Sequence, residues 1–126
     1  ARRHSMARLL QARISTIFGM DIHPGATIGK GVMFDHANGV VVGETAHIGD
    51  NCSFLHNVTL GGTGKEDGDR HPKLGHDVSV GAGVSILGNI RVGDGAKIGA
   101  GSVVLREVPT GATMVGIPAK QIVRKA

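Results

Sequence analysis

Aliphatic residues recur at every sixth position along most of this chain. The series is Ile22, Ile28 and Phe34; then, after a two-residue slip, Val42, Ile48, Phe54 and Leu60; then, after a longer insertion, Leu74, Val80, Ile86, Val92, Ile98 and Val104. Four positions after most of these residues comes a small or β-branched one, such as Ala26, Cys52 or Val84. Glycine often follows the aliphatic residue directly, as in Ile48-Gly49.

A period of six fits neither a helix of 3.6 residues per turn nor the two-residue alternation of an amphipathic strand. It fits a solenoid in which three short, flat strands make one triangular coil of about eighteen residues. The aliphatic side chain then points inward, the smaller one fills the remaining space, and Gly or Asn occupies corners with positive φ. We therefore predict an all-β solenoid, a left-handed parallel β-helix of hexapeptide repeats, over residues 21–115.

Three segments depart from the repeat. Residues 1–20 carry apolar side chains at helical spacing up to Gly19, which predicts a short N-terminal helix, the end of a helical region. The insertion at 61–73 is polar, and a loop that leaves a regular solenoid is more often functional than not. Residues 116–126 break the pattern and are predicted to close the open end of the solenoid.

Composition agrees with a single repeat domain and argues against several classes of function. The 126 residues include 21 Gly and no Trp or Tyr, so a conventional globular core is not expected. The net charge of +4 comes without aromatic interleaving or a reading motif, which argues against nucleic-acid binding. No apolar run approaches the ~20 residues that span a membrane.

The single cysteine, Cys52, excludes an internal disulfide and indicates a reducing compartment. We therefore expect the protein to be cytoplasmic, with a plastid as the alternative. Cys52 falls on the small inward position of its hexad, so we interpret it as a core thiol and not as a nucleophile.

Grouping the hexads in threes predicts a polar column. Phe34, Phe54, Val80 and Ile98 then share one row, and the residues two places further on are His36, His56, Ala82 and Ala100. We expect these four to lie one above another at the strand spacing of ~4.8 Å. Two imidazoles would sit at one end of the column, and the alanines would form a smooth wall for an extended ligand.

Five segments resemble serine acetyltransferases, in that family's order and spacing. They are Asp21-Ile22-His23-Pro24, Asp35-His36-Ala37, Gly43-Glu44-Thr45-Ala46, Gly61-Gly62-Thr63-Gly64 and Asp69-Arg70-His71-Pro72. The hexad repeat alone would indicate only the wider group of hexapeptide acyltransferases. The resemblance implies transfer of acetyl from acetyl-CoA to the hydroxyl of L-serine, giving O-acetylserine for cysteine biosynthesis.

The resemblance also implies residue roles. His36 would be the general base and Asp21 the carboxylate that orients it, a pairing that rests on the resemblance alone. The amino acid would be held by Asp35, Arg70 and His71, and the coenzyme by Gly62, Thr63, Ala82, Lys97 and Ala100. A histidine suits this base, because its pKa near 6.5 lets it take the serine proton during attack on the thioester. No metal is required.

The family further implies a homotrimer with active sites between subunits. Its members carry a larger helical N-terminal domain that joins trimers into hexamers, and only the last helix of that domain is expected here, so a hexamer is not expected. Many members also bind O-acetylserine sulfhydrylase through a terminal isoleucine. This chain ends in Arg124-Lys125-Ala126, so that partnership is not expected.

Three alternatives stay open. One is an O-acetyltransferase for another hydroxyl acceptor, such as a sugar or an antibiotic. Another is a zinc enzyme resembling γ-class carbonic anhydrases, which share this fold and use three histidines; His71 and His76 have the required spacing of five, and His36 lies upstream. The third is a non-catalytic β-helix scaffold.

Overall fold

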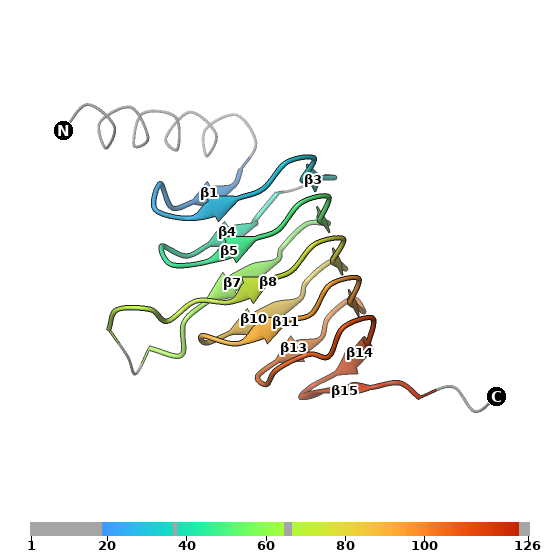
Figure 1. The fold of residues 1–126 in the computed structure, drawn as a ribbon. Helices are drawn as coiled ribbons and strands as arrows, with labels where there is room; N and C mark the ends of the chain where they lie inside the picture. Colours follow the sequence, from blue (N-terminus) through green and yellow to red (C-terminus); the bar gives the residue numbers. More distant parts are fainter. Residues whose placement is uncertain (1–18, 37, 65–66, 124–126) are drawn as a thin grey trace.

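The computed structural model describes residues 19–36, 38–64 and 67–123 of the chain. The helix predicted within residues 1–20 lies outside them. The described residues form three sheets, which make the three faces of a prism (Figure 1). The predicted left-handed parallel β-helix is confirmed.

Each turn of the chain adds one short strand to each face. Face A contains β1 (Asp21–Ile22), β4 (Val41–Val42), β7 (Thr59–Gly61), β10 (Ser85–Leu87) and β13 (Val103–Val104). Face B contains β2 (Thr27–Ile28), β5 (His47–Ile48), β8 (Lys73–Leu74) and β11 (Arg91–Val92). Face C contains β3 (Met33–Phe34), β6 (Ser53–Phe54), β9 (Ser79–Val80), β12 (Lys97–Ile98), β14 (Thr113–Gly116) and β15 (Ala119–Gln121).

Strand register places the hexad residues in vertical stacks. On face A, Ile22 pairs with Val42, and Val42 with Leu60. On face C, Phe34 pairs with Phe54, whose ring stacks on it with centroids 5.3 Å apart. A strand of two residues is not stable alone. Its stability comes from the parallel strands beside it and from the inward side chains that fill the prism.

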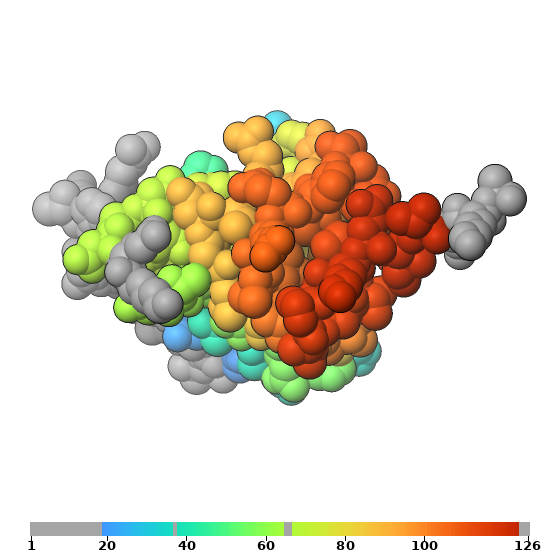
Figure 2. All heavy atoms as spheres, turned by 90° about the horizontal axis from the view of Figure 1, so that it is seen from below, coloured from blue at the N-terminus to red at the C-terminus, as the bar shows by residue number. Residues whose placement is uncertain are grey.

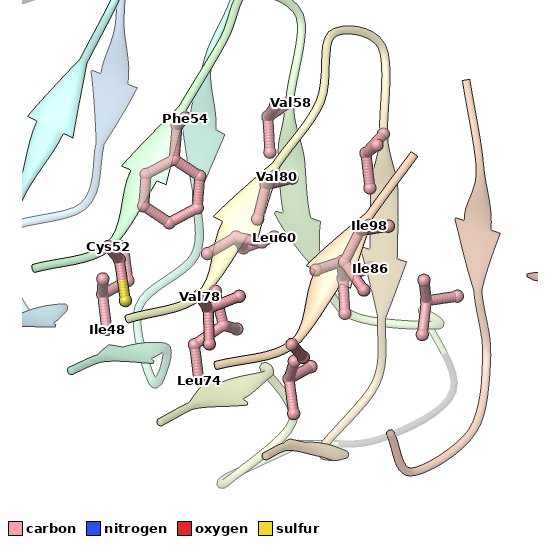
Figure 3. Packing of buried hydrophobic residues seen from close by; sticks show 14 of the residues in the cluster. Ile48, Cys52, Phe54, Val58, Leu60, Leu74, Val78, Val80, Ile86 and Ile98 are labelled. Atoms are coloured by element: carbon pink, nitrogen blue, oxygen red, sulfur yellow. The ribbon is translucent and has the colours of Figure 1, made fainter. Parts of the chain in front are cut away.

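The interior consists of the two sets of hexad positions that the sequence pattern singles out (Figure 3). The aliphatic set is buried at most levels. Among the smaller residues Ala46, Val58 and Val78 have no exposed surface, whereas Ala26, Val32 and Ile90 are partly buried. Cys52 is also fully buried, its thiol contacts the carbonyl of Gly75 at 3.1 Å, and burial raises its pKa. The interpretation of Cys52 as a core thiol is confirmed.

The last strands change direction. β15 pairs with β14 in the antiparallel sense, whereas the other pairs of named strands are parallel. The space-filling view in Figure 2 shows the last coil and this hairpin, in orange and red, covering the C-terminal end of the prism. The boundary predicted at residue 116 stays a prediction.

Candidate functional site

His36 lies on a bulge at the edge between faces C and A. The ladder continues past Phe34 to Asp35, whose amide donates to the carbonyl of Phe54. The two-residue slip in the hexad pattern then projects from the edge, and His36 adopts a positive φ of 50°. Its side chain is 88% exposed, and its Nε2 lies 3.6 Å from Oδ1 of Asp35.

The prediction that His36 stacks on His56 is wrong. Along this edge the amide of Asn57 donates to the carbonyl of Asn38, and the amide of Gly83 donates to the carbonyl of His56. Asn38 therefore occupies the corner position that corresponds to His56. The slip supplies two more residues than the corner needs, so the coil bulges them outward and takes His36 out of the column.

The other members of the predicted column lie where the pattern places them. The amide of Gly101 donates to the carbonyl of Ala82, which continues the corner stack to Ala100. Lys97 lies on the outer side of β12 and is exposed. Gly62 and Thr63 follow β7 at the start of the insertion, at the edge between faces A and B, so the predicted coenzyme contacts lie on two edges and on face C of one chain.

Asp21 is the first residue of β1, on the outer side of face A, and its Cα partner across the ladder is Val41. The carboxylate is exposed. Its pairing with His36 stays a prediction, and the carboxylate beside His36 in the structure is Asp35.

The insertion ends with Arg70 and His71 packed against the edge between faces A and B. The hydroxyl of Thr45 accepts hydrogen bonds from the amide of Arg70 at 3.0 Å and from the amide of His71 at 3.1 Å. The His71 ring lies directly over Gly43, where a Cβ would overlap the ring atoms. Glycine at position 43 is thus required by this close approach.

His71 is held neutral. Its residue is only 7% exposed, and desolvation lowers its pKa, helped by the positive charges of Arg70 and Lys73. The amide of Thr45 points at Nδ1 of the ring at 3.1 Å. Since an amide can only donate, Nδ1 is an acceptor and the ring proton resides on Nε2.

The guanidinium of Arg70 is held from two sides. Nη1 donates to the carbonyl of Gly68 at 2.8 Å, and Nη2 donates to Oε1 of Glu44 at 3.3 Å. A shallow, open pocket lies here, lined by the end of the insertion and by the corner and face B residues beneath it: Gly25, Glu44, Thr45, His47, Gly68, Asp69 and Arg70. Nearby, Lys73 pairs with Asp69 at 2.6 Å and lowers the pKa of that carboxyl.

The predicted site residues therefore form two groups within one chain. His36 and Asp35 lie at the edge between faces C and A, whereas Arg70 and His71 lie at the edge between faces A and B. About five residues of face A separate these edges, which is roughly 15 Å at 3.3 Å per residue. We therefore expect a molecule as small as an amino acid to contact only one of these groups in the same chain.

The three histidines of the zinc alternative also lie on different edges. His76 is at the corner between faces B and C, where its Nδ1 accepts the amide of Asp50 at 2.8 Å. In the part of the chain that the structure describes, no three His, Cys, Asp or Glu side chains are grouped so as to hold a metal ion. No helix within those residues has the length and apolar character of a membrane span.

The lowered pKa of His71 predicts an acid-sensitive fold. The unfolded chain protonates this ring near pH 6.5, but the folded chain resists protonation, so stability is full above that pH and falls as the pH drops below it. One such proton gives a slope of up to about 1.4 kcal/mol per pH unit. Denaturant unfolding between pH 8 and 5 measures it. The slope should flatten in His71→Gln but not in His56→Ala, and equal slopes in all three proteins would contradict the prediction.

Three contacts of this site were not predicted. The resemblance gives no role to the residues of the Gly43-Glu44-Thr45 segment, yet this segment lies beneath the His71 ring and holds Arg70. The sequence shows that the insertion leaves the aliphatic series after Leu60, but it does not show which residues of the preceding coil the end of the insertion contacts.

Comparison with known proteins gives consistent matches. Residues 71–106 match the family model described as bacterial transferase hexapeptide (six repeats). A serine acetyltransferase of Salmonella typhimurium is 60% identical over 118 residues, which are 94% of this chain and 43% of that protein. The chain thus spans less than half of that relative's length.

Solved structures extend the similarity to the fold. Soybean serine acetyltransferase complexed with serine superimposes with a TM-score of 0.90 and 63% identity, over 94% of this chain and 49% of that one. Serine acetyltransferase from Brucella abortus in complex with coenzyme A gives a TM-score of 0.89 and 51% identity, over 99% of this chain and 55% of that one. These matches confirm the resemblance that the sequence motifs indicate.

Proposed function

We propose that this chain, similar in sequence and fold to serine acetyltransferases, transfers acetyl from acetyl-CoA to the hydroxyl of L-serine and so makes O-acetylserine for cysteine biosynthesis. One observation carries the proposal. The His36 bulge and the Arg70–His71 loop end carry Asp35-His36-Ala37 and Asp69-Arg70-His71-Pro72, two of the motifs on which the resemblance to serine acetyltransferases rests. Similar proteins have been solved with serine and with coenzyme A bound.

The chemistry follows from these groups. His36, open to solvent, takes the proton from the serine hydroxyl as its oxygen attacks the thioester carbonyl. The new C–O bond forms, the C–S bond breaks, and the imidazolium returns its proton to the departing thiolate. A carboxylate beside the imidazolium stabilises its charge; Asp35 lies at 3.6 Å, and the resemblance assigns Asp21 to the same task.

Arg70 and His71 suit the recognition of the amino acid. A guanidinium and an imidazole Nε2–H offer only donors toward a ligand, which matches the carboxylate of serine. Asp35, exposed beside the base, suits its ammonium group. The alanines at positions 82 and 100 leave room along the edge for the extended coenzyme, with Gly62, Thr63 and Lys97 as further contacts.

An assay that compares acceptors for the acetyl group tests this function. Thiol release from acetyl-CoA is measured with L-serine, with a sugar acceptor, with an aminoglycoside and without acceptor. We expect release that depends on L-serine. A higher kcat/KM with the sugar or the antibiotic would support the other acetyltransferase alternative, release without acceptor would contradict acetyl transfer, and no release at all would favour the scaffold.

We also propose that the working unit is a homotrimer. The two groups of site residues are too far apart to meet in one chain, but edges of neighbouring prisms can face each other. One interface then combines the His36 edge of one subunit with the Arg70 edge of the next. The proposed reaction therefore requires residues from two neighbouring subunits.

Mixed assemblies test the trimer. His36→Asn and Arg70→Ala proteins should each be nearly inactive, whereas co-refolding them should restore part of the activity, because some interfaces then combine two intact edges. Sedimentation equilibrium should give three chains per particle. Co-refolded protein as inactive as its parents would argue for a site within one chain.

A further inference from the structure

The resemblance assigns no role to Thr45, yet this residue makes several polar contacts with the end of the insertion. Its hydroxyl accepts two consecutive amides, those of Arg70 and His71, and lies 2.8 Å from Nδ1 of the His71 ring. Its own amide donates to the same Nδ1. These contacts join residues 25 and 26 positions apart, so Thr45 attaches the returning end of the insertion to the preceding coil.

The position of Thr45 explains why its hydroxyl is the group used. Thr45 follows Glu44 at the turn from face A to face B, directly beneath the loop end, and is partly buried there. A hydroxyl can accept two hydrogen bonds and donate one. It satisfies both loop amides and still offers its proton to the ring nitrogen, which an ionised carboxylate cannot do because it has no proton to donate.

The same contacts orient the side chains of Arg70 and His71. With Nδ1 accepting, His71 presents a neutral Nε2–H, and with its amide attached to Thr45, Arg70 reaches Glu44 and the Gly68 carbonyl. Both groups are then oriented donors before any ligand arrives. Pre-oriented donors lower the ordering cost of binding a carboxylate.

We infer that Thr45 is a positioning residue that makes Arg70 and His71 a carboxylate-binding pair, and so makes the enzyme select an amino-acid acceptor over a simple alcohol. This inference rests on the proposed function. It assigns to Thr45 no contact with the substrate, only the orientation of the two residues that make it.

Two acceptors separate this role from a merely structural one. L-serine and ethanolamine share the hydroxyl and the amino group, but ethanolamine has no carboxylate. Thr45→Val keeps the shape of the side chain and removes the hydroxyl, leaving two loop amides without an acceptor. We expect the KM for L-serine to rise roughly tenfold or more with a smaller change in kcat, and kcat/KM for ethanolamine to stay within about twofold.

Two further variants complete the comparison. Thr45→Ser restores the hydroxyl and should restore the KM for L-serine. Thr27→Val makes the same chemical change on the outer side of β2 and should alter neither acceptor. An equal loss with both acceptors would mean that Thr45 only supports the fold, and an unchanged KM for L-serine in Thr45→Val would overturn the inference.

Amide hydrogen exchange gives a second measurement that does not need activity. In the parent protein the amides of Arg70 and His71 should be protected, and in Thr45→Val they should exchange at least about tenfold faster. The amide of His47, which donates to the carbonyl of Pro72, serves as the internal reference. Unchanged exchange at Arg70 and His71 would overturn the inference, whereas a parent that ignores L-serine in the assay would overturn the proposed function instead.

Discussion

Replacing His36 should lower kcat/KM for serine-dependent thiol release by at least ~10²-fold, the lower end of what a general base contributes. The serine hydroxyl is a poor nucleophile at neutral pH, so without an imidazole its proton has no acceptor during attack on the thioester. The exposure of His36, with a carboxylate 3.6 Å away, leaves its ring free to meet a substrate.

The choice of substitution matters because His36 has a φ of 50°. Asparagine adopts this left-handed conformation more readily than alanine does, so His36→Asn removes the base with less backbone strain. His36→Ala should show a similar loss if the imidazole is the cause. His56→Ala removes an exposed imidazole from the regular part of the same edge and should lose less than tenfold.

Thiol release, followed at saturating acetyl-CoA with varied L-serine, measures these effects. Far-UV circular dichroism should match the parent in each variant. If His36→Asn retained more than a tenth of the parent kcat/KM, His36 would not be the base, and the proposed mechanism would fail.

Replacing Phe54 with alanine should lower the free energy of unfolding by about 3–5 kcal/mol. Phe54 is only 1% exposed, has the largest fully buried side chain among the residues that the structure describes, and stacks on Phe34. The prism is narrow and its strands are short, so the space left by the ring cannot collapse without shifting the coils above and below. Against a typical domain stability of 5–15 kcal/mol, such a loss is severe.

Denaturant unfolding at one fixed protein concentration measures this loss, since assembly would otherwise shift the midpoint. Met33→Ala is the matched control: Met33 is the outward residue of β3, is 61% exposed, and should change stability by less than about 0.5 kcal/mol. A loss of under 1 kcal/mol in Phe54→Ala would mean that the interior rearranges around the missing ring.

The fold could be predicted because its signal is local and repeated. The hexad pattern predicts which side chain of each repeat points inward. The strand register of face C agrees with the predicted row of Phe34, Phe54, Val80 and Ile98. The buried position of Cys52 followed from the same pattern. Many hexads predict the same inward position, so the prediction of the fold does not depend on any single residue.

The site could be predicted only as a set of residues. Hexad counting placed His36 in line with His56, but the structure removes it from that column, because two extra residues must bulge where the corner needs none. Counting hexads assumes that the two extra residues only shift the numbering of the positions that follow. In the structure, hydrogen bonds to the next coil decide which residues stay in the column and which bulge outward.

The pattern of residues was enough to predict the prism, its inward side chains and the segments that carry chemistry, because the inward positions recur every six residues. The three-dimensional fold was needed to show that the insertion returns onto Thr45 and Gly43, and that His36 and Arg70 occupy different edges. Those outcomes depend on where a loop lands among coils about 26 positions away, and loop closure over that distance leaves no periodic trace in the sequence.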